Sequence, residues 1–162
     1  CDAHQIRTQN PSPPGNRGVF LLEKTMFIKK SYDHYGLTVV QDRSLEFAIA
    51  FSEEEADAAA REAIEDNLWA FNPEFVASHC TVKVPHLGSI QRELGEDAGD
   101  VYRSLIKDFD HFVKDAIAAD GRGHFLSGYD GEERKLKQCD WASELREDIE
   151  DLDDDCLIYR IN

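Results

Sequence analysis

Apolar and polar residues alternate in the first strongly patterned part of the chain, which begins near Met26. Two short β-prone runs, Met26–Tyr32 and Leu37–Val40, are separated by turn-forming residues, and Leu45–Phe51 places its apolar side chains on one face. These three runs predict a strand meander. A fourth apolar run, Cys156–Ile161, closes the chain and predicts one more strand.

From Ser52 onward the apolar positions follow a helical period. Ser52 and Glu55 form a capping box, which predicts that a helix begins there. Its apolar stripe is expected to comprise Ala56, Ala60, Ile64, Leu68, Phe71 and Phe75. Pro73 is expected to bend or break this helix. The segment Thr81–Gly88 is interpreted as a connection, and Ser89–Leu94 as one or two helical turns.

The clearest amphipathic pattern extends from Asp97 to Asp120 and predicts a second helix, which Gly121 and Gly123 are expected to end. Phe109 and Phe112 belong to its buried stripe. A third and shorter helix is expected to be capped by Asp140, with a stripe made of Trp141, Leu145, Ile149 and Leu152.

The dipeptide Asp130-Gly131 is favoured at two-residue hairpin turns, because both residues tolerate positive φ. It predicts a hairpin between the runs His124–Tyr129 and Glu132–Leu136. Strands grouped before and after the helices, without regular βαβ alternation, predict an α+β fold. We expect a small antiparallel sheet with two or three amphipathic helices packed on one face.

The chain has 162 residues, the size of one typical domain, and residues 26–162 are expected to form a single acidic domain. Residues 1–25 are rich in proline and glycine and show no periodicity before Val19–Leu22. Met26, the only methionine, stands where the patterned sequence begins. We therefore interpret residues 1–25 as an N-terminal extension that is disordered or not native.

The charge of the chain narrows its range of partners. With 33 acidic and 18 basic residues, the net charge is −15, which argues against direct nucleic-acid binding and against attraction to anionic lipid. A basic protein surface is the expected partner. The apolar stretches are far shorter than the roughly 20 residues of a membrane-spanning helix. Four widely spaced cysteines without a CxxC pair favour a soluble protein of the reducing cytoplasm.

The glycine-rich segment Asp120–Glu133 carries the most chemically varied group of side chains. An acid, a cation and an imidazole come together there, and the candidate binding residues are Asp120, Arg122, His124, Tyr129 and Asp130. The segment lacks the glycine order of a phosphate-binding loop, so turns are its simpler interpretation. No catalytic residue is predicted.

Two groups of residues have metal-ligand chemistry. His79, Cys80 and His86 lie close together in sequence, and Asp108, His111 and Asp115 share one face of the second expected helix. Helix-end packing and a solvated helix face explain them more simply. The acidic run Asp151–Asp155 lacks the glycine and glutamate of a calcium loop. The sequence therefore predicts no metal site and no cofactor.

Two runs, Leu68–Phe75 and Asp120–Ser127, the second followed by Tyr129–Glu133, resemble small uncharacterised proteins of tailed-phage and related metagenomic genomes. The resemblance covers most of residues 26–162. It implies a viral origin, and with it the cytoplasm of a bacterial host. That family has no established activity, so the resemblance implies no role for any residue.

Three functional hypotheses follow from these patterns. The leading one is a non-enzymatic accessory protein of phage type that binds a basic protein surface, in one form as a nucleic-acid mimic that inhibits a DNA-binding protein. The alternative is a small enzyme or metal-dependent protein with a site near the glycine-rich turn 120–133. The third is a homo-oligomer whose interface uses Trp69, Phe71, Phe75 and Trp141. The absence of a catalytic motif favours the first.

Overall fold

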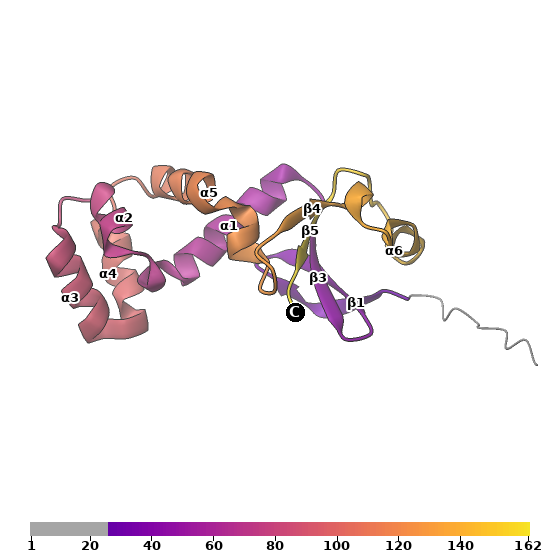
Figure 1. The fold of residues 1–162 in the computed structure, drawn as a ribbon, viewed down its shortest axis with the longest axis horizontal. Helices are drawn as coiled ribbons and strands as arrows, with labels where there is room; N and C mark the ends of the chain where they lie inside the picture. The colour runs from indigo at the N-terminus through magenta and orange to yellow at the C-terminus, as the bar shows by residue number, and fades with distance from the viewer. Residues whose placement is uncertain (1–25) are drawn as a thin grey trace, which may run out of the picture.

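The computed structural model describes residues 26–162, which form an elongated molecule with a β-sheet towards one end and a group of helices at the other (Figure 1). All five strands are antiparallel to their neighbours, in the order β1-β2-β3-β5-β4. They are β1 (Ile28–His34), β2 (Leu37–Asp42), β3 (Leu45–Ala50), β4 (Glu133–Lys135) and β5 (Leu157–Arg160). The expected α+β class, strand meander and closing strand are confirmed.

Six α-helices complete the described part of the chain. They are α1 (Glu53–Asp66), α2 (Pro73–Ser78), α3 (Val84–Leu94), α4 (Ala98–Leu105), α5 (Phe109–Leu126) and α6 (Ala142–Asp148). Three short 3-10 turns link them: η1 (Leu68–Ala70), η2 (Gly95–Asp97) and η3 (Leu136–Gln138). None of these helices is both long and apolar enough to cross a lipid bilayer.

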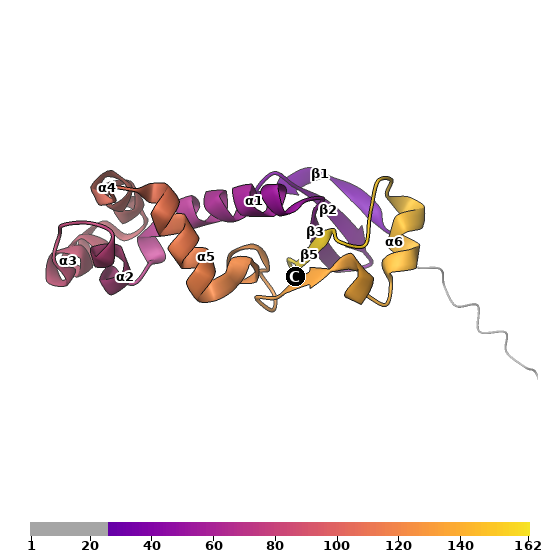
Figure 2. The same ribbon diagram turned by 90° about the horizontal axis from the view of Figure 1, so that it is seen from above.

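Helices cover both faces of the sheet. Helix α1 and the end of α5 pack on one face, where the alanines of α1 meet Ala48, Leu157 and Tyr159. Helix α6 lies on the opposite face, where Leu145 packs against Ile49 and its neighbours (Figure 2). The expected packing on one face therefore holds for α1 and α5, while the third expected helix is on the other face. A sheet covered on both sides explains why Val39 and Val40, which point in opposite directions, are both fully buried.

A separate cluster of apolar side chains holds the helical end together. It contains Ile64 from the end of α1, Leu68 from η1, Phe112 from α5, and residues of α2, α3 and α4. Tyr102 is fully buried there, and its hydroxyl donates to the Leu87 carbonyl (2.8 Å). Helices α1 and α5 thus contribute side chains both to this cluster and to the sheet.

The beginning of α1 agrees with the capping prediction. The Ser52 hydroxyl accepts a hydrogen bond from the Glu55 amide (3.2 Å), and the Glu55 carboxylate accepts one from the Phe51 amide (2.8 Å). The expected break is present, but it lies earlier than Pro73. Helix α1 ends at Asp66, and Pro73 begins α2 behind the N-cap Asn72.

Two helix predictions are wrong in their boundaries. Pro85 does not mark a connection, because it lies in the first turn of α3, where a proline lacks no helical hydrogen bond. The single helix expected over Asp97–Asp120 is two helices, since the chain leaves helical geometry after Leu105 and Asp108 caps α5 by accepting from the His111 amide (3.0 Å). Because the apolar period continues from α4 into α5, the sequence pattern does not show where the first helix ends.

The predicted hairpin around Asp130-Gly131 does not form. His124–Leu126 belongs to α5, and β4 pairs with β5 instead. Gly131 adopts a positive φ of 71°, but Asp130 does not, so both the expected two-residue hairpin turn and the strand before it were wrong. At α6 the N-cap position is Trp141, one residue after the expected Asp140. The expected extension, residues 1–25, lies outside the described residues.

Candidate functional site

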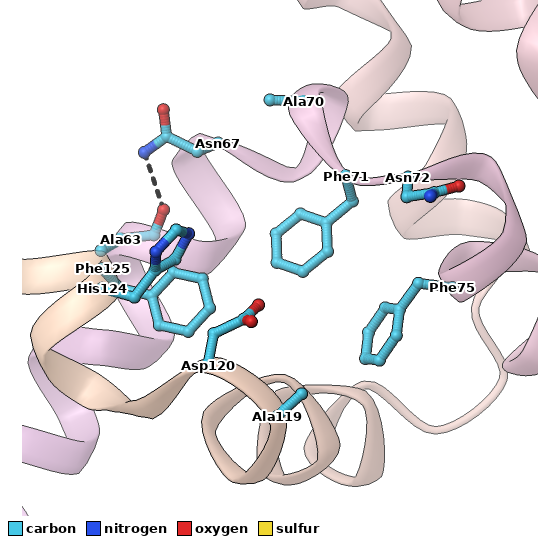
Figure 3. A pocket seen from close by; sticks show the side chains of 10 residues that line it. All are labelled: Ala63, Asn67, Ala70, Phe71, Asn72, Phe75, Ala119, Asp120, His124 and Phe125. Carbon is cyan, nitrogen blue, oxygen red and sulfur yellow. Dashed lines mark hydrogen bonds between the residues drawn. The ribbon is translucent and has the colours of Figure 1, made fainter. Parts of the chain in front are cut away.

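A cavity of about 650 Å³ opens where α1 and α5 separate, between the sheet and the helical end (Figure 3). Its walls come from α1, the η1 turn, the start of α2 and the last turns of α5. The lining residues are Ala63, Asn67, Ala70, Phe71, Asn72, Phe75, Ala119, Asp120, His124 and Phe125. The volume is within the range of small-ligand sites.

Three half-buried phenyl rings form the apolar wall of this cavity. Phe71 stacks on Phe125 with ring centroids 6.1 Å apart and planes 11° apart, and it packs against Phe75 at 5.8 Å. Phe71 and Phe75 each contact the fully buried ring of Phe112 at 5.1 Å. Because Phe112 is fixed in the helical cluster, the wall is pre-formed.

The polar side of the cavity depends on an interruption in α5. Gly121 has φ 79° and ψ 156°, a conformation that is essentially restricted to glycine. The kink lets Asp120, which ends the first segment of the helix, and His124, in the second segment, line the same cavity. The Asp120 carboxylate points into the space between the aromatic rings (Figure 3). The His124 ring stands edge-on to Phe125 at 5.0 Å.

The Asp120 carboxylate has no partner of its own. Within residues 26–162 it forms no hydrogen bond and no ion pair. It also stands at the carboxyl end of a helical segment, where the helix dipole disfavours a negative charge. Asp120 is exposed, so water solvates its carboxylate. A cation entering the cavity would pair with this carboxylate, whereas an anion would be repelled.

Hydrogen bonds hold the rim of the cavity in place. The Asn67 amide donates to the Ala63 carbonyl (2.9 Å), and the Asn72 carboxamide oxygen accepts from the Glu74 amide (2.9 Å). From α3, the Gln91 side chain reaches the carbonyls of Trp69 (2.6 Å) and Phe71 (3.1 Å). The segment that carries Phe71 is therefore tied to two helices.

Arg122, another predicted site residue, points away from this cavity. Its guanidinium makes two hydrogen bonds to the Glu133 carboxylate (2.8 and 2.9 Å) and one to Asp57 on α1 (3.0 Å), and it pairs with Glu53. The buried Tyr159 hydroxyl donates to Glu133 (2.6 Å). Burial alone would lower the Arg122 pKa, but the bonds to Glu133 and Glu53 raise it above its ordinary value. This network joins α5 to α1 and β4, so the role of Arg122 is structural.

Tyr129 and Asp130 belong to the turn after α5. The ring of Tyr129 is 60% exposed and lies 3.5 Å below the Arg160 guanidinium. Asp130 accepts from Arg134 (2.7 Å) and lies within hydrogen-bond distance of the Ser127 hydroxyl (2.7 Å). Of the five predicted site residues, the structure brings together Asp120 and His124.

The aromatic wall was not predicted as part of a site. Phe71 and Phe75 were assigned to the buried stripe of a single helix, because their spacing continues the period of α1. The helix break at Asn67 turns them towards α5 instead. The signal in the sequence is the combination of Pro73 with aromatic residues on both sides of it.

We compared the chain with protein-family models, with curated protein sequences and with solved structures, and found no match in any of the three.

Proposed function

We propose that this protein acts by binding a basic protein partner, and that its pocket receives a Lys or Arg side chain of that partner. The observation that supports the proposal is the unpaired carboxylate of Asp120, which faces an aromatic wall. An ammonium or guanidinium group gains from both, through a charge-assisted hydrogen bond to the carboxylate and through cation–π contact with the rings.

Two further features favour a cationic ligand. The chain carries a net charge of −15, which attracts cations over a distance and accelerates their association. The long methylene stem of Lys or Arg suits an apolar cavity, because such side chains bury the stem and keep the charged group at a polar site. Phe71, Phe75 and Phe125 line a space of this kind.

The nucleic-acid mimic is less well supported than binding through a pocket. A mimic needs a row of free carboxylates, but several carboxylates in the two most acidic stretches are paired within the chain. Glu53 and Asp57 pair with Arg122, and Asp155 pairs with Lys135 (3.0 Å) and Lys137 (3.1 Å). These carboxylates stabilise the fold.

The enzyme alternative has one observation in its favour, since Asp120 and His124 lie on the same cavity. An acid and an imidazole can transfer protons. The ten lining residues include no Ser, Thr, Cys, Lys or Tyr, so the candidate nucleophiles on this cavity are Asp120 and His124. Within residues 26–162, neither side chain is hydrogen-bonded to a base that would activate it. Binding therefore explains the pocket better than chemistry does.

The proposed location is the cytoplasm, of a bacterial host if the resemblance to phage proteins reflects the origin of the chain. Cys80, Cys139 and Cys156 are free thiols. Unpaired cysteines are typical of a reducing compartment, and this supports the proposed location.

The proposal can be tested with a peptide rich in Lys and Arg as the probe. The association rate and affinity are measured over a series of salt concentrations for the unmodified protein, for Asp120→Asn, and for Glu150→Gln as a control with the same charge change. Glu150 is exposed and follows α6, the helix on the opposite face of the sheet from α1 and α5.

Added salt should slow association in all three proteins, because charges are screened over about 8 Å at physiological ionic strength. Asp120→Asn should weaken binding about fivefold, corresponding to about 1 kcal/mol for a partly exposed charge pair. Glu150→Gln should leave affinity nearly unchanged. Equal effects of the two substitutions would show that the peptide binds by general charge attraction and not through the pocket.

A further inference from the structure

Three ligand-type side chains outside the pocket converge at the junction of α2 and α5. His79 follows the last turn of α2, and His111 and Asp115 are one turn apart on α5. Their ligand atoms all lie within 4.8 Å of one another. The two histidine Nε2 atoms are each 3.5 Å from Asp115 Oδ2. His79 comes from the first group considered in the sequence, and His111 and Asp115 come from the second.

These distances suit a bound metal ion. With ligand bonds of about 2.0–2.1 Å, the donor atoms around a tetrahedral Zn²⁺ lie about 3.3 Å from one another. The two histidine–aspartate distances are already close to that value. A small rotation of the exposed His111 ring would complete the arrangement, since this side chain is 63% exposed.

The surroundings hold His79 in place. Its side chain is only 7% exposed, and its ring packs against Phe75 (5.2 Å) and Phe112 (5.0 Å). The backbone carbonyl of His79 accepts a hydrogen bond from the Lys107 amide (3.3 Å), which ties the end of α2 to the start of α5. The packing around His79 therefore orients one of the three ligands, which is what outer-shell residues do in metal sites.

We propose that His79, His111 and Asp115 bind one divalent transition-metal ion of the Zn²⁺ type. Two imidazoles and one carboxylate favour Zn²⁺, Co²⁺, Ni²⁺ or Fe²⁺ over Mg²⁺ and Ca²⁺, which prefer sites made of oxygen ligands. The site opens to a cavity of about 340 Å³, so water or another small ligand has room at the remaining coordination positions. This site is separate from the aromatic pocket, and the inference does not rest on the proposed function.

Neighbouring groups do not replace the metal in this arrangement. Among residues 26–162, no Lys or Arg nitrogen lies within ion-pair distance of Asp115. The Asp108 carboxylate caps α5, and the Cys80 thiol is directed to the Val82 carbonyl (3.8 Å). His86, which the sequence placed in the same group as His79, is exposed on α3 and is not part of the cluster.

Calorimetric titration of the metal-free full chain with Zn²⁺ tests the proposal at a pH where imidazoles are neutral. Co²⁺ serves as a spectroscopic substitute, and Mg²⁺ and Ca²⁺ are titrated separately. The variants are Asp115→Asn and His111→Asn, which change exposed or half-exposed side chains, with His86→Asn as the matched control. Circular dichroism and thermal unfolding confirm that each variant is folded.

The unmodified protein and His86→Asn should bind one Zn²⁺ with the same affinity at this site, and they should give the same Co²⁺ spectrum. Asp115→Asn and His111→Asn should each lower that affinity at least about tenfold and change the spectrum, because the site loses one of its three ligands. Folded variants that bind Zn²⁺ as tightly as the unmodified protein would overturn the assignment. Binding of Mg²⁺ or Ca²⁺ as tight as that of Zn²⁺ would do so as well.

Discussion

At the level of single residues, Phe112 connects the two sites. Its fully buried ring contacts Phe71 and Phe75 in the pocket wall, and it contacts His79 of the proposed metal site at 5.0 Å. It also stacks on Phe109, with planes 9° apart. The Phe112 ring therefore packs against both the wall of the pocket and the proposed metal site.

Phe112→Ala should lower the free energy of unfolding by about 3–5 kcal/mol, the usual effect of removing a buried phenyl ring. Phe109→Ala, at a position that is 5% exposed, should cost a similar amount. Denaturant unfolding measures both. A loss below about 1 kcal/mol for Phe112→Ala would mean that the ring is not part of a packed core.

Asp130 illustrates how a predicted site residue can serve stability instead. Burial would raise its pKa, but hydrogen bonds from Ser127 and Arg134 lower it to about 2, below the ordinary value of 3.8. A lowered folded-state pKa means that this carboxylate stabilises the fold above about pH 4 and loses its contribution as the pH falls towards 2.

We expect Asp130→Asn to reduce the stability of the protein at neutral pH and to flatten the decline of stability between pH 4 and pH 2. Unfolding free energies measured across this range for both proteins provide the test. An unchanged pH profile in the variant would contradict the assigned hydrogen bonds. Asp140→Asn, a nearby acidic position, serves as the comparison.

At the level of elements, α5 is the one that builds the pocket. Its two segments meet at Gly121, where the backbone conformation is strained for any other residue, although no atom lies within 4 Å of an added Cβ. Two residues later, a Cβ on Gly123 would come within 2.4 Å of the Gly131 carbonyl. The first glycine permits the kink, and the second permits close packing of the segment that follows.

Gly121→Ala should therefore cost about 1–3 kcal/mol of stability, the range for a residue forced into a glycine-only conformation. Gly88→Ala on α3 is the matched control, because an added Cβ there makes only ordinary contacts, the nearest at 3.5 Å. In a helix interior it should be neutral or stabilising by up to about 1 kcal/mol. Thermal or denaturant unfolding distinguishes the two, and equal effects would rule out strain at Gly121 as the cause.

The elements that the sequence predicted correctly are those with local signals. The β1–β3 meander, β5 and the start of α1 follow from alternation and from the Ser52 cap. The errors arose where a cap competes with a continuous apolar period, as at Asp108, and where pairing depends on distant residues, as for β4 with β5. The pocket was predicted only at Asp120 and His124, because its aromatic wall requires two helices to turn towards each other.

At the scale of the whole molecule, the acidic residues have two different roles. Asp153 accepts from the amides of Asp155 and Cys156, and Asp154 pairs with Arg146, so these carboxylates hold the turn before β5. Neutralising them would disturb the fold as well as the surface. Asp120 is different, since its charge has no partner among the described residues and its removal tests binding alone.

The aromatic residues expected to form an oligomer interface are largely used within the chain. Trp141 packs between Phe27 (5.2 Å) and Phe47 (4.8 Å) on the α6 face of the sheet. Phe71 and Phe75 form the pocket wall. These aromatic residues are therefore less available for an oligomer interface, and the pocket is the recognition surface that we propose.

The most direct test of this central claim compares two small probes that differ in charge. Nα-acetyl-lysine amide, which keeps its side-chain ammonium, and its neutral analogue Nα-acetyl-norleucine amide are titrated into the unmodified protein and into Asp120→Asn, and binding is followed by NMR. The unmodified protein should prefer the lysine probe about fivefold, with shifts at Phe71, Phe75 and Phe125. Asp120→Asn should reduce this preference, leaving the part that comes from the aromatic rings. The same preference in both proteins, or shifts confined to residues outside the pocket, would contradict this claim.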